Sequence, residues 1–180
     1  MTHGLQKQQM LPIPDSYWVI EGQFLAGEYP GSCFSDEQMR HRLDAFIELG
    51  FSTMIDLTGE DEIGRYDQIL QEQAGNYGVV MTYLRFPIVD FGLPSRELMT
   101  HVLNAIDAAI ADGQKVYVHC HGGIGRTGTT VGCFLVRHGM CGREALEKLA
   151  GWWAQVPKSA RHPHSPETSM QRAFVLDWAG

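Results

Sequence analysis

The chain has 180 residues, and its 14 Lys and Arg against 21 Asp and Glu give a formal net charge of -7. Hydrophobic residues make up 44% of it and charged residues 19%, a balance that argues against disorder and suits one domain of this length. The lack of a basic excess disfavours a nucleic-acid partner, and no apolar run approaches the roughly 20 residues of a membrane span. We therefore expect neither nucleic acid nor a membrane among the partners.

The N-terminal residues 1–16 are polar and contain proline, and we expect them to form an arm on the surface of a domain over residues 17–180. They contain no apolar core followed by a small-residue cleavage site, so they predict no signal peptide. The chain has four cysteines without a close pairing pattern: Cys33, Cys120, Cys133 and Cys141. This spacing predicts free thiols and a reducing, cytoplasmic compartment.

Short strands and helices alternate through the first half of the chain. Apolar residues at 17–20 and 24–25 predict a small hairpin. Ser35 caps a predicted helix that ends at Gly50, and residues 51–57 read as a buried strand.

The next segments continue this alternation. Residues 61–74 are expected to be partly helical, residues 75–78 to form a turn, and residues 79–86 to form another strand.

In the second half a helix is predicted from apolar residues one turn apart at Leu98, Val102, Ile106 and Ile110. A short strand over 115–119 follows, then a glycine-rich run that leads into a helix, and a further helix over 146–153. Ser165, Pro166 and Glu167 predict the start of a last helix, with Met170, Phe174 and Trp178 on its inner face. The alternation predicts a single three-layer α/β domain whose central, mostly parallel sheet is flanked by helices.

The segment KVYVHCHGGIGRTGTT, residues 115–130, carries the chemical information. A buried strand ends at His119, a tight loop follows, and a helix begins near Arg126. Glycines allow the loop to fold inward, so that its N–H groups and the helix N-terminus face one centre. We therefore predict a phosphate cradle formed by His121, Gly122, Gly123, Ile124, Gly125 and Arg126.

Two other phosphate-binding motifs are tested against this segment. A Walker A motif requires Gly-Lys followed by Ser or Thr, and the segment has no such lysine. The dinucleotide pattern is matched by Gly123, Gly125 and Gly128, but it requires a second parallel strand after the helix. Residues 139–180 offer two helices and no apolar strand, so this match is accidental.

Cys120 opens the loop and Arg126 closes it, with five residues between them. Inward-facing N–H groups and a helix N-terminus stabilise the thiolate form of a cysteine, and the thiolate is the competent nucleophile. The guanidinium of Arg126 can bind two phosphate oxygens at once. The Thr127 hydroxyl can donate a hydrogen bond to the Cys120 sulfur. His119 can order the loop by a hydrogen bond to the loop backbone.

The segment HCHGGIGRT, residues 119–127, resembles the His-Cys-x5-Arg-Thr signature of the cysteine-based protein tyrosine phosphatase superfamily. The short chain, without the longer phosphotyrosine-recognition motif, is similar to the dual-specificity branch. The resemblance implies the phosphatase-like fold and a general acid on a loop upstream of the nucleophile. Asp90 in FPIVDFGLPS, residues 86–95, fits that acid; Asp56 and Asp61 are its rivals, and Asp112 lies at the wrong end of its strand.

The resemblance also implies a segment that positions water for the second half-reaction. Residues 167–174 read ETSMQRAF, where Gln171 and Phe174 match the family pattern and Glu167 replaces its first glutamine. Gln171 is therefore the better candidate for positioning water, with Glu167 as a second one. For Glu167, ordinary helix capping is an equally good interpretation.

Together these features predict a metal-independent phosphomonoester hydrolase without a cofactor, a protein tyrosine or dual-specificity phosphatase with a phosphocysteine intermediate. Its substrate would be a phosphorylated protein or peptide. The alternatives are a phosphoprotein-binding module with an inactive site, a phosphoinositide phosphatase, and a sulfur- or arsenic-handling enzyme. The loop interior contains no lysine, which tilts the prediction away from inositol lipids.

Overall fold

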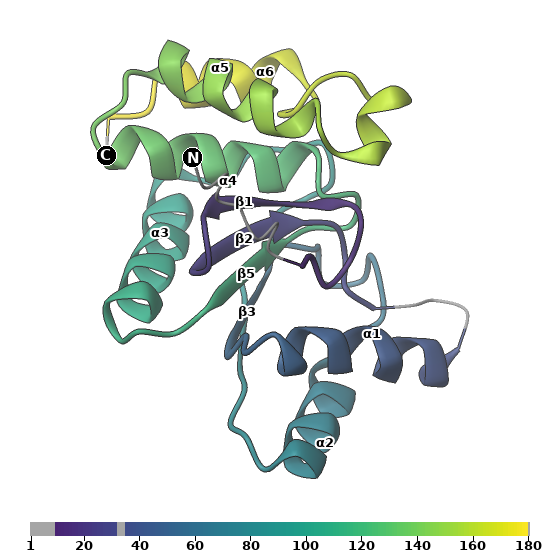
Figure 1. Ribbon diagram of the computed structural model, residues 1–180. Helices are drawn as coiled ribbons and strands as arrows, with labels where there is room; N and C mark the ends of the chain where they lie inside the picture. The colour runs from purple at the N-terminus through teal and green to yellow at the C-terminus, as the bar shows by residue number, and fades with distance from the viewer. Residues whose placement is uncertain (1–9, 32–34, 180) are drawn as a thin grey trace, which may run out of the picture.

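A five-stranded sheet forms the middle layer of the protein in the computed structural model, which describes residues 10–31 and 35–179 (Figure 1). The strands lie in the order β1-β2-β5-β3-β4, and all neighbouring pairs are parallel except the β1–β2 hairpin. They are β1 (Ser16–Ile20), β2 (Phe24–Gly27), β3 (Thr53–Asp56), β4 (Thr82–Arg85) and β5 (Val116–His119). The predicted α/β architecture with a mostly parallel sheet is confirmed.

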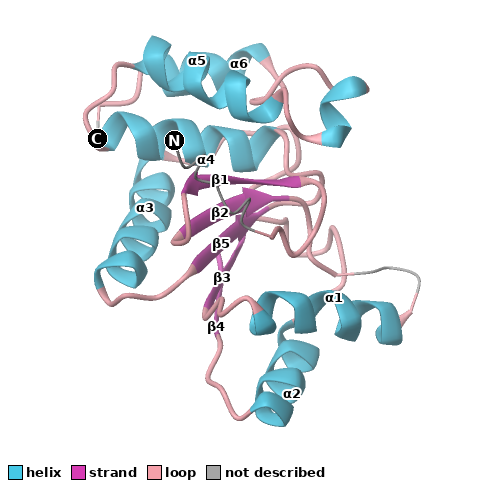
Figure 2. Ribbon diagram, in the orientation of Figure 1, coloured by secondary structure: helices cyan, strands magenta, loops and turns pink. Residues whose placement is uncertain are grey.

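Helices cover both faces of this sheet (Figure 2). One face carries α1 (Asp36–Glu48) and α2 (Asp67–Tyr77). The other carries α3 (Arg96–Ala111) and α4 (Gly125–Arg137). The helices α5 (Gly142–Trp153) and α6 (Ser169–Leu176) pack against α4 (Figure 2), with the short 3₁₀ helix η1 (Pro157–Ala160) between them in the chain. None of the described helices is long and apolar enough to cross a membrane.

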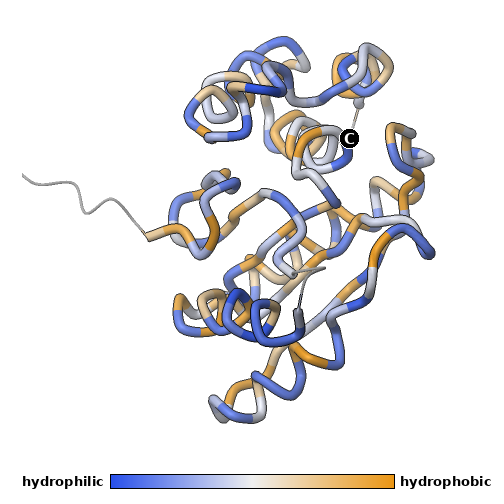
Figure 3. Tube along the Cα trace, turned by 90° about the vertical axis from the view of Figure 1, so that its right-hand side faces the viewer, coloured by the Kyte–Doolittle hydropathy of each residue, from blue (hydrophilic) through white to orange (hydrophobic). Residues whose placement is uncertain are grey.

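The strands supply both cores because successive side chains of a strand point to opposite faces. In β2, Phe24 and Ala26 pack in the core under α4, while Leu25 packs in the core under α1. In β5, Val118 packs in the core under α4 and Tyr117 packs in the core under α1. Along the helices hydrophobic and hydrophilic stretches alternate (Figure 3), as expected for helices that bury one face.

Several boundaries differ from the sequence prediction: α5 begins at Gly142 and not at 146, and β4 covers only Thr82–Arg85 of the strand expected over 79–86. The helix expected to be partial over 61–74 begins only at Asp67 and runs through the expected turn, ending where Gly78 adopts φ +67°. The last helix begins at Ser169 and not near Ser165, because Thr168 and Gln171 form a capping box.

The correction to the last helix also changes its buried face. Gln171 and Val175 point inward, whereas Met170, predicted to do so, is 60% exposed. The Ser165 hydroxyl, predicted to cap the helix, donates instead to the backbone oxygen of Ile124. Within the expected N-terminal arm, Ile13 is buried.

The sheet order sets where the chemical groups gather. β2 and β3 flank β5 as parallel neighbours, so all three strands end at one edge, where Gly27, Asp56 and His119 lie in register. Residues after the carboxyl ends of parallel strands form the usual ligand crevice of such sheets. In the described part of the chain no strand follows β5, which confirms that a dinucleotide-binding half is not completed.

Candidate active site

The Cys120 loop, defined as residues 120–126, connects the end of β5 to the first turn of α4. Cys120 follows the last residue of β5 directly and is 2% exposed. The loop turns into α4 at Gly125, so that the N-terminus of this buried helix faces the loop centre. Cys120 and Arg126 therefore lie at the two ends of one short loop, as the sequence predicts.

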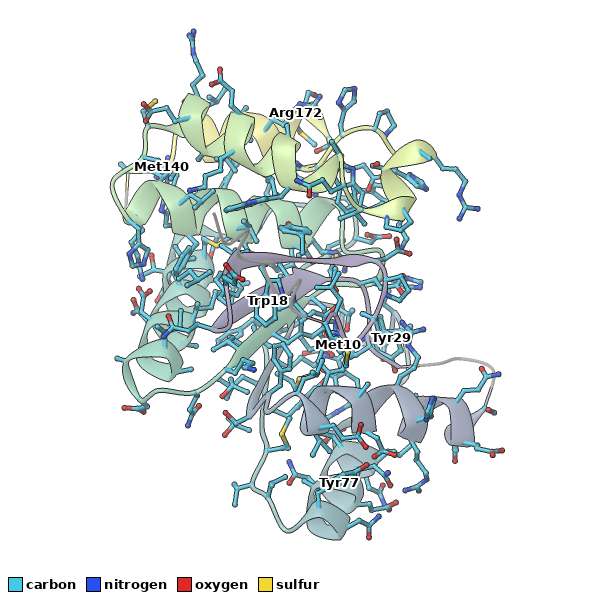
Figure 4. All side chains as sticks on the ribbon, in the orientation of Figure 1. Met10, Trp18, Tyr29, Tyr77, Met140 and Arg172 are labelled. Carbon is cyan, nitrogen blue, oxygen red and sulfur yellow. The ribbon has the colours of Figure 1, made fainter. Side chains whose placement is uncertain are left out.

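Donors around the Cys120 loop bind its backbone oxygens. The pairs are His119 Nδ1 with Cys120 O (3.1 Å), Tyr29 N with His121 O (2.9 Å), Lys158 Nζ with Gly122 O (3.1 Å) and Ser165 Oγ with Ile124 O (2.8 Å). In a planar trans peptide the C=O and the following N–H point in opposite directions. Tying the oxygens to surrounding elements therefore turns the following N–H groups toward the loop interior. Tyr29, labelled in Figure 4, is one of the residues that do this.

Gly123 is required by its backbone and by its surroundings. Its φ is +73°, a conformation that side chains rarely adopt. A Cβ here would lie 2.5 Å from both Glu28 N and Gly27 C, where backbone cannot move aside. The Cys120 loop thus packs backbone to backbone against the end of β2.

His119 is fully buried, and its hydrogen bonds define its tautomer. Cys120 O can only accept, so Nδ1 carries the proton, and Nε2 then accepts from Tyr66 Oη at 2.7 Å. Burial lowers the pKa of His119, which keeps the ring neutral at pH 7. A neutral imidazole in this arrangement orients the backbone of Cys120.

Asp56, a rival for the acid, is committed to a structural network at the end of β3. Its Oδ1 accepts from Thr58 N (2.8 Å) and Thr58 Oγ1 (2.7 Å), and its Oδ2 accepts from Tyr83 Oη (2.6 Å). Burial alone would raise the pKa of Asp56, but the nearby His119 and these hydrogen bonds hold it below its ordinary value. A buried carboxylate held in this way is poorly placed to donate a proton.

Arg126 is buried, with a side chain 2% exposed, and it pairs with Glu62 through both terminal nitrogens. Nη2 lies 2.6 Å from Oε1, and Nη1 binds Oε2 of the same carboxylate. Burial opposes ionisation of each partner, yet their pairing lowers the pKa of Glu62 and raises that of Arg126. The guanidinium is therefore a fixed cation at the end of the Cys120 loop.

Glu62 is a site residue that the sequence interpretation missed. It lies in the loop after β3, and β3 is the neighbour of the strand that leads to Cys120. Gly59 N donates to its carboxylate (3.0 Å), and Arg85 from β4 binds backbone oxygens of residues 58–60. The sequence signal that could have identified Glu62 is a charged residue shortly after a central strand. Only the strand order shows that this residue contacts Arg126 at the end of the Cys120 loop.

The loop of residues 86–95 brings Asp90 to Arg126. Asp90 Oδ1 lies 2.7 Å from Arg126 Nη2, and Ile88 O accepts from Nη1 at 3.0 Å. The Asp90 side chain is 48% exposed, so it can reach both the site and solvent. Asp61 is exposed and makes no described contact with Arg126, and Asp112 caps the C-terminus of α3 before β5 begins.

The remaining candidates are placed as follows. Thr127 Oγ1 donates to Gly27 O (3.3 Å), and this is its described hydrogen bond in place of the expected one to the sulfur. Gln171 lies against Gly125 and donates to Gly92 O (3.2 Å) on the Asp90 loop. The Glu167 side chain lies 3.9 Å from His162 Nδ1 and makes no described contact with the Cys120 loop.

The other cysteines and histidines lie apart from this chemistry. Cys133 is buried in α4, and burial raises the pKa of its thiol. Cys141 precedes α5 at the surface, and Cys33 lies outside the described residues. Within the described ranges, no group of three or more His, Cys, Asp and Glu is arranged to hold a metal ion.

Comparison with known proteins adds family information. A family model described as "Polymorphic toxin system, DSP-PTPase phosphatase" matches residues 32–140. Protein tyrosine phosphatase domain-containing protein 1 of Mus musculus is 29% identical over 185 residues, which cover 96% of this chain and 22% of that protein. Putative tyrosine phosphatase 067L of Invertebrate iridescent virus 3 is 34% identical over 90 residues, covering 48% of this chain and 34% of that protein. The chain thus spans about a fifth of the first relative.

Solved structures share the fold. Tk-PTP in its active form matches with a TM-score of 0.65 and 23% identity, over 91% of this chain and 94% of that one. Kinase associated phosphatase, with its catalytic cysteine replaced by serine, matches with a TM-score of 0.69 and 15% identity, over 93% of this chain and 94% of that one. PTPMT1 in complex with PI(5)P matches with a TM-score of 0.67 and 19% identity, over 91% of this chain and 94% of that one.

Proposed function

Since the chain belongs to the DSP-PTPase phosphatase family of polymorphic toxin systems, we propose that it is a protein tyrosine or dual-specificity phosphatase with a phosphocysteine intermediate. One observation carries the proposal: Asp90 Oδ1 lies 2.7 Å from Arg126 Nη2, on the loop that begins with Cys120. This contact supports a site in which Cys120 is the nucleophile, Arg126 binds the phosphate and Asp90 is the acid. A module that only binds phosphate needs no such acid.

In the first half-reaction the Cys120 thiolate attacks phosphorus and an S–P bond forms as the P–O bond to the leaving group breaks. Arg126 and the inward N–H groups bind the equatorial oxygens, over which charge spreads in the loose transition state. The phosphate dianion competes with Asp90 for Arg126, because both offer oxygens to the same guanidinium. Asp90, released from this ion pair, takes up a proton from solvent and donates it to the leaving oxygen.

In the second half-reaction water attacks the phosphocysteine. Asp90, now a carboxylate, takes the proton of the attacking water, and the S–P bond breaks to release inorganic phosphate and the thiolate. Gln171 supports this step because its amide lies against the Cys120 loop and binds the Asp90 loop. Glu167 is the weaker candidate, since its carboxylate lies beside His162.

The surroundings of Asp90 favour an aromatic leaving group. Val89, Phe91 and Leu93 on the same loop are exposed apolar residues, and Phe91 adopts φ +56°, which is unusual for a bulky side chain. Apolar side chains next to the acid would contact the ring of phosphotyrosine.

A thiolate nucleophile also requires a reducing compartment, which favours the cytoplasm.

Hydrolysis of an aryl phosphate, followed in a chelator and in its absence, tests the proposal. We expect turnover that the chelator does not change, and loss of turnover in Cys120→Ser with the fold retained. Substantial activity of Cys120→Ser would rule out the nucleophile, and loss of activity in chelator would rule out the metal-independent mechanism.

A panel of phosphopeptides, nucleotides and phosphoinositides then separates the substrate classes. Release of phosphate from phosphotyrosine peptides supports the proposal. Exclusive release from phosphoinositides would assign the chain to lipid substrates, and tight phosphopeptide binding without release would make it a binding module.

A further inference from the structure

Lys158 comes from η1, far along the chain from the Cys120 loop, yet its ammonium group binds that loop. Nζ donates to Gly122 O at 3.1 Å and lies 2.5 Å from Glu28 Oε2. The side chain is only 16% exposed. A lysine covered to this extent has lost much of its hydration, so these protein contacts determine where its charge sits.

The neighbours of Lys158 hold it in one position. Asp15 Oδ1 accepts from the Lys158 backbone N–H at 3.0 Å. Glu28, the partner of the ammonium group, is itself held by Arg42 at 2.8 Å. Asp15 Oδ2 also lies 3.8 Å from Nζ, so the ammonium group is fixed between the N-terminal segment, the end of β2 and the Cys120 loop.

The position matters because of the peptide that Lys158 binds. Gly122 and Gly123 are adjacent glycines, the residues with the greatest backbone freedom. Since the peptide between them is planar, holding Gly122 O on the outside aims the Gly123 N–H at the loop interior. The other described ties of this kind come from a backbone amide, an imidazole and a hydroxyl, and only this one comes from a cation.

We propose that Lys158 is a positioning residue for the Cys120 loop: its ammonium group holds the Gly122 carbonyl outward, so that the Gly123 N–H is oriented to bind a phosphate oxygen. The inference builds on the proposed function, since that oxygen belongs to the phosphate monoester. Lys158 itself lies outside the loop and does not touch the substrate. Its contribution therefore appears in oxyanion binding and in KM.

The test measures binding of tungstate, an unreactive tetrahedral oxyanion, by calorimetry. We expect Lys158→Met to bind tungstate about tenfold more weakly than the unmodified chain, and to show a raised KM for an aryl phosphate. Lys158→Arg, which keeps a cationic donor, should restore tungstate binding to within about threefold. The matched control is Arg161→Met, which removes the same charge from an exposed residue three positions along.

A second comparison separates positioning from a simple salt bridge. Glu28→Gln removes the shorter of the two ion pairs of Lys158, since Asp15 Oδ2 also lies 3.8 Å from Nζ. It leaves an amide oxygen that accepts from Lys158, so tungstate binding should stay within about threefold. An equal loss in Glu28→Gln and Lys158→Met would overturn the proposal, because the salt bridge alone would then account for the effect. Unchanged tungstate binding by folded Lys158→Met would also overturn it.

Folding and turnover are checked separately. If Lys158→Met does not fold, Lys158→Gln takes its place with the same expected weakening and the same overturning result. If the unmodified chain binds tungstate but hydrolyses no phosphate ester, the proposed function fails while the role of Lys158 is still decided by tungstate binding. If the chain hydrolyses phosphate esters and Lys158→Met binds tungstate normally, only the role of Lys158 fails.

Discussion

The carboxylate of Glu62 binds both terminal nitrogens of Arg126, with Nη2 2.6 Å from Oε1. This pairing fixes the plane of the guanidinium at the end of the Cys120 loop, where the proposed mechanism requires two phosphate oxygens to meet it side by side. A flexible arginine would lose that orientation each time substrate leaves. Glu62 is thus a positioning residue that acts through Arg126.

Replacing Glu62 by glutamine should therefore lower kcat more than it changes KM. Hydrogen bonds between charged groups contribute about 1.5–3 kcal/mol, so we expect kcat to fall by roughly tenfold to a hundredfold. Steady-state kinetics on an aryl phosphate measure this. Glu60→Gln, an exposed carboxylate in the same loop, serves as control and should keep its kcat. A normal kcat in Glu62→Gln would show that Arg126 orients itself without a brace.

Asp90→Asn should lower kcat by about 10²–10⁴-fold, since the variant cannot donate a proton. The unmodified chain should show a bell-shaped pH profile, because the proposed mechanism needs both a thiolate nucleophile and a protonated general acid. In Asp90→Asn the alkaline limb of this profile should disappear. The same substitution at Asp61 should leave the profile as it was. If instead the alkaline limb is lost in Asp61→Asn, the acid has been assigned to the wrong loop residue.

Gly123→Ala and Gly122→Ala form a matched pair on the Cys120 loop. A Cβ on Gly123 would meet backbone at 2.5 Å from an unfavourable φ, whereas one on Gly122 would meet only the Ile124 side chain at 3.5 Å. We expect Gly123→Ala to lower the free energy of unfolding by about 2 kcal/mol or more. Gly122→Ala should stay within about 0.5 kcal/mol of the unmodified chain. Denaturant unfolding of both variants measures the difference, and equal stabilities would contradict the described packing.

The buried His119 predicts a pH dependence of stability. Its pKa is lowered in the folded chain, so below its ordinary value of 6.5 the unfolded chain binds a proton that the folded chain does not. Stability should then fall as the pH drops below about 6.5, by up to about 1.4 kcal/mol per pH unit. The pKa values of Asp56 and Glu62 are lowered from their ordinary values of 3.8 and 4.5. These two groups therefore add a further loss of stability only in stronger acid.

Thermal unfolding between pH 7 and 5.5 isolates the histidine contribution. His119→Gln should be less stable at pH 7 but should lose less further stability over this range. His101→Gln, a change at an exposed residue of α3, should follow the unmodified chain. An identical slope in His119→Gln would mean that another group titrates in this window.

Phe91→Ala tests the preference for an aromatic leaving group. Removal of the ring should lower kcat/KM for phosphotyrosine peptides by about tenfold, within the range for a lost aromatic contact, and should affect phosphoserine peptides much less. Val80→Ala, at an apolar residue that is 85% exposed and lies outside the Asp90 loop, is the control. An equal loss on both classes of peptide would show that Phe91 shapes the loop and not the specificity.

The sequence by itself determined the local chemistry. Within a single segment, Cys120 and Arg126 are separated by five residues with glycines between them, and such a pattern defines a loop whose groups are close because the chain is short there. Alternating strands and helices likewise predicted the layered fold. The start of the last helix was not determined locally, because Ser165 and Thr168 both offer a capping hydroxyl and the tertiary contact of Ser165 with Ile124 decided between them.

The tertiary structure decided how distant groups reach this loop: Asp90, which the resemblance had implied, and Glu62 and Lys158, whose contacts with the loop the sequence had not indicated. Glu62 and Asp90 reach Arg126 because β3 and β5 are parallel neighbours and the loops after β3 and β4 extend over the same edge of the sheet. Lys158 reaches Gly122 because η1 packs against the outside of the loop. Periodicity along a chain carries no information on which strand ends meet, so contacts across more than 30 residues depend on strand order and helix packing.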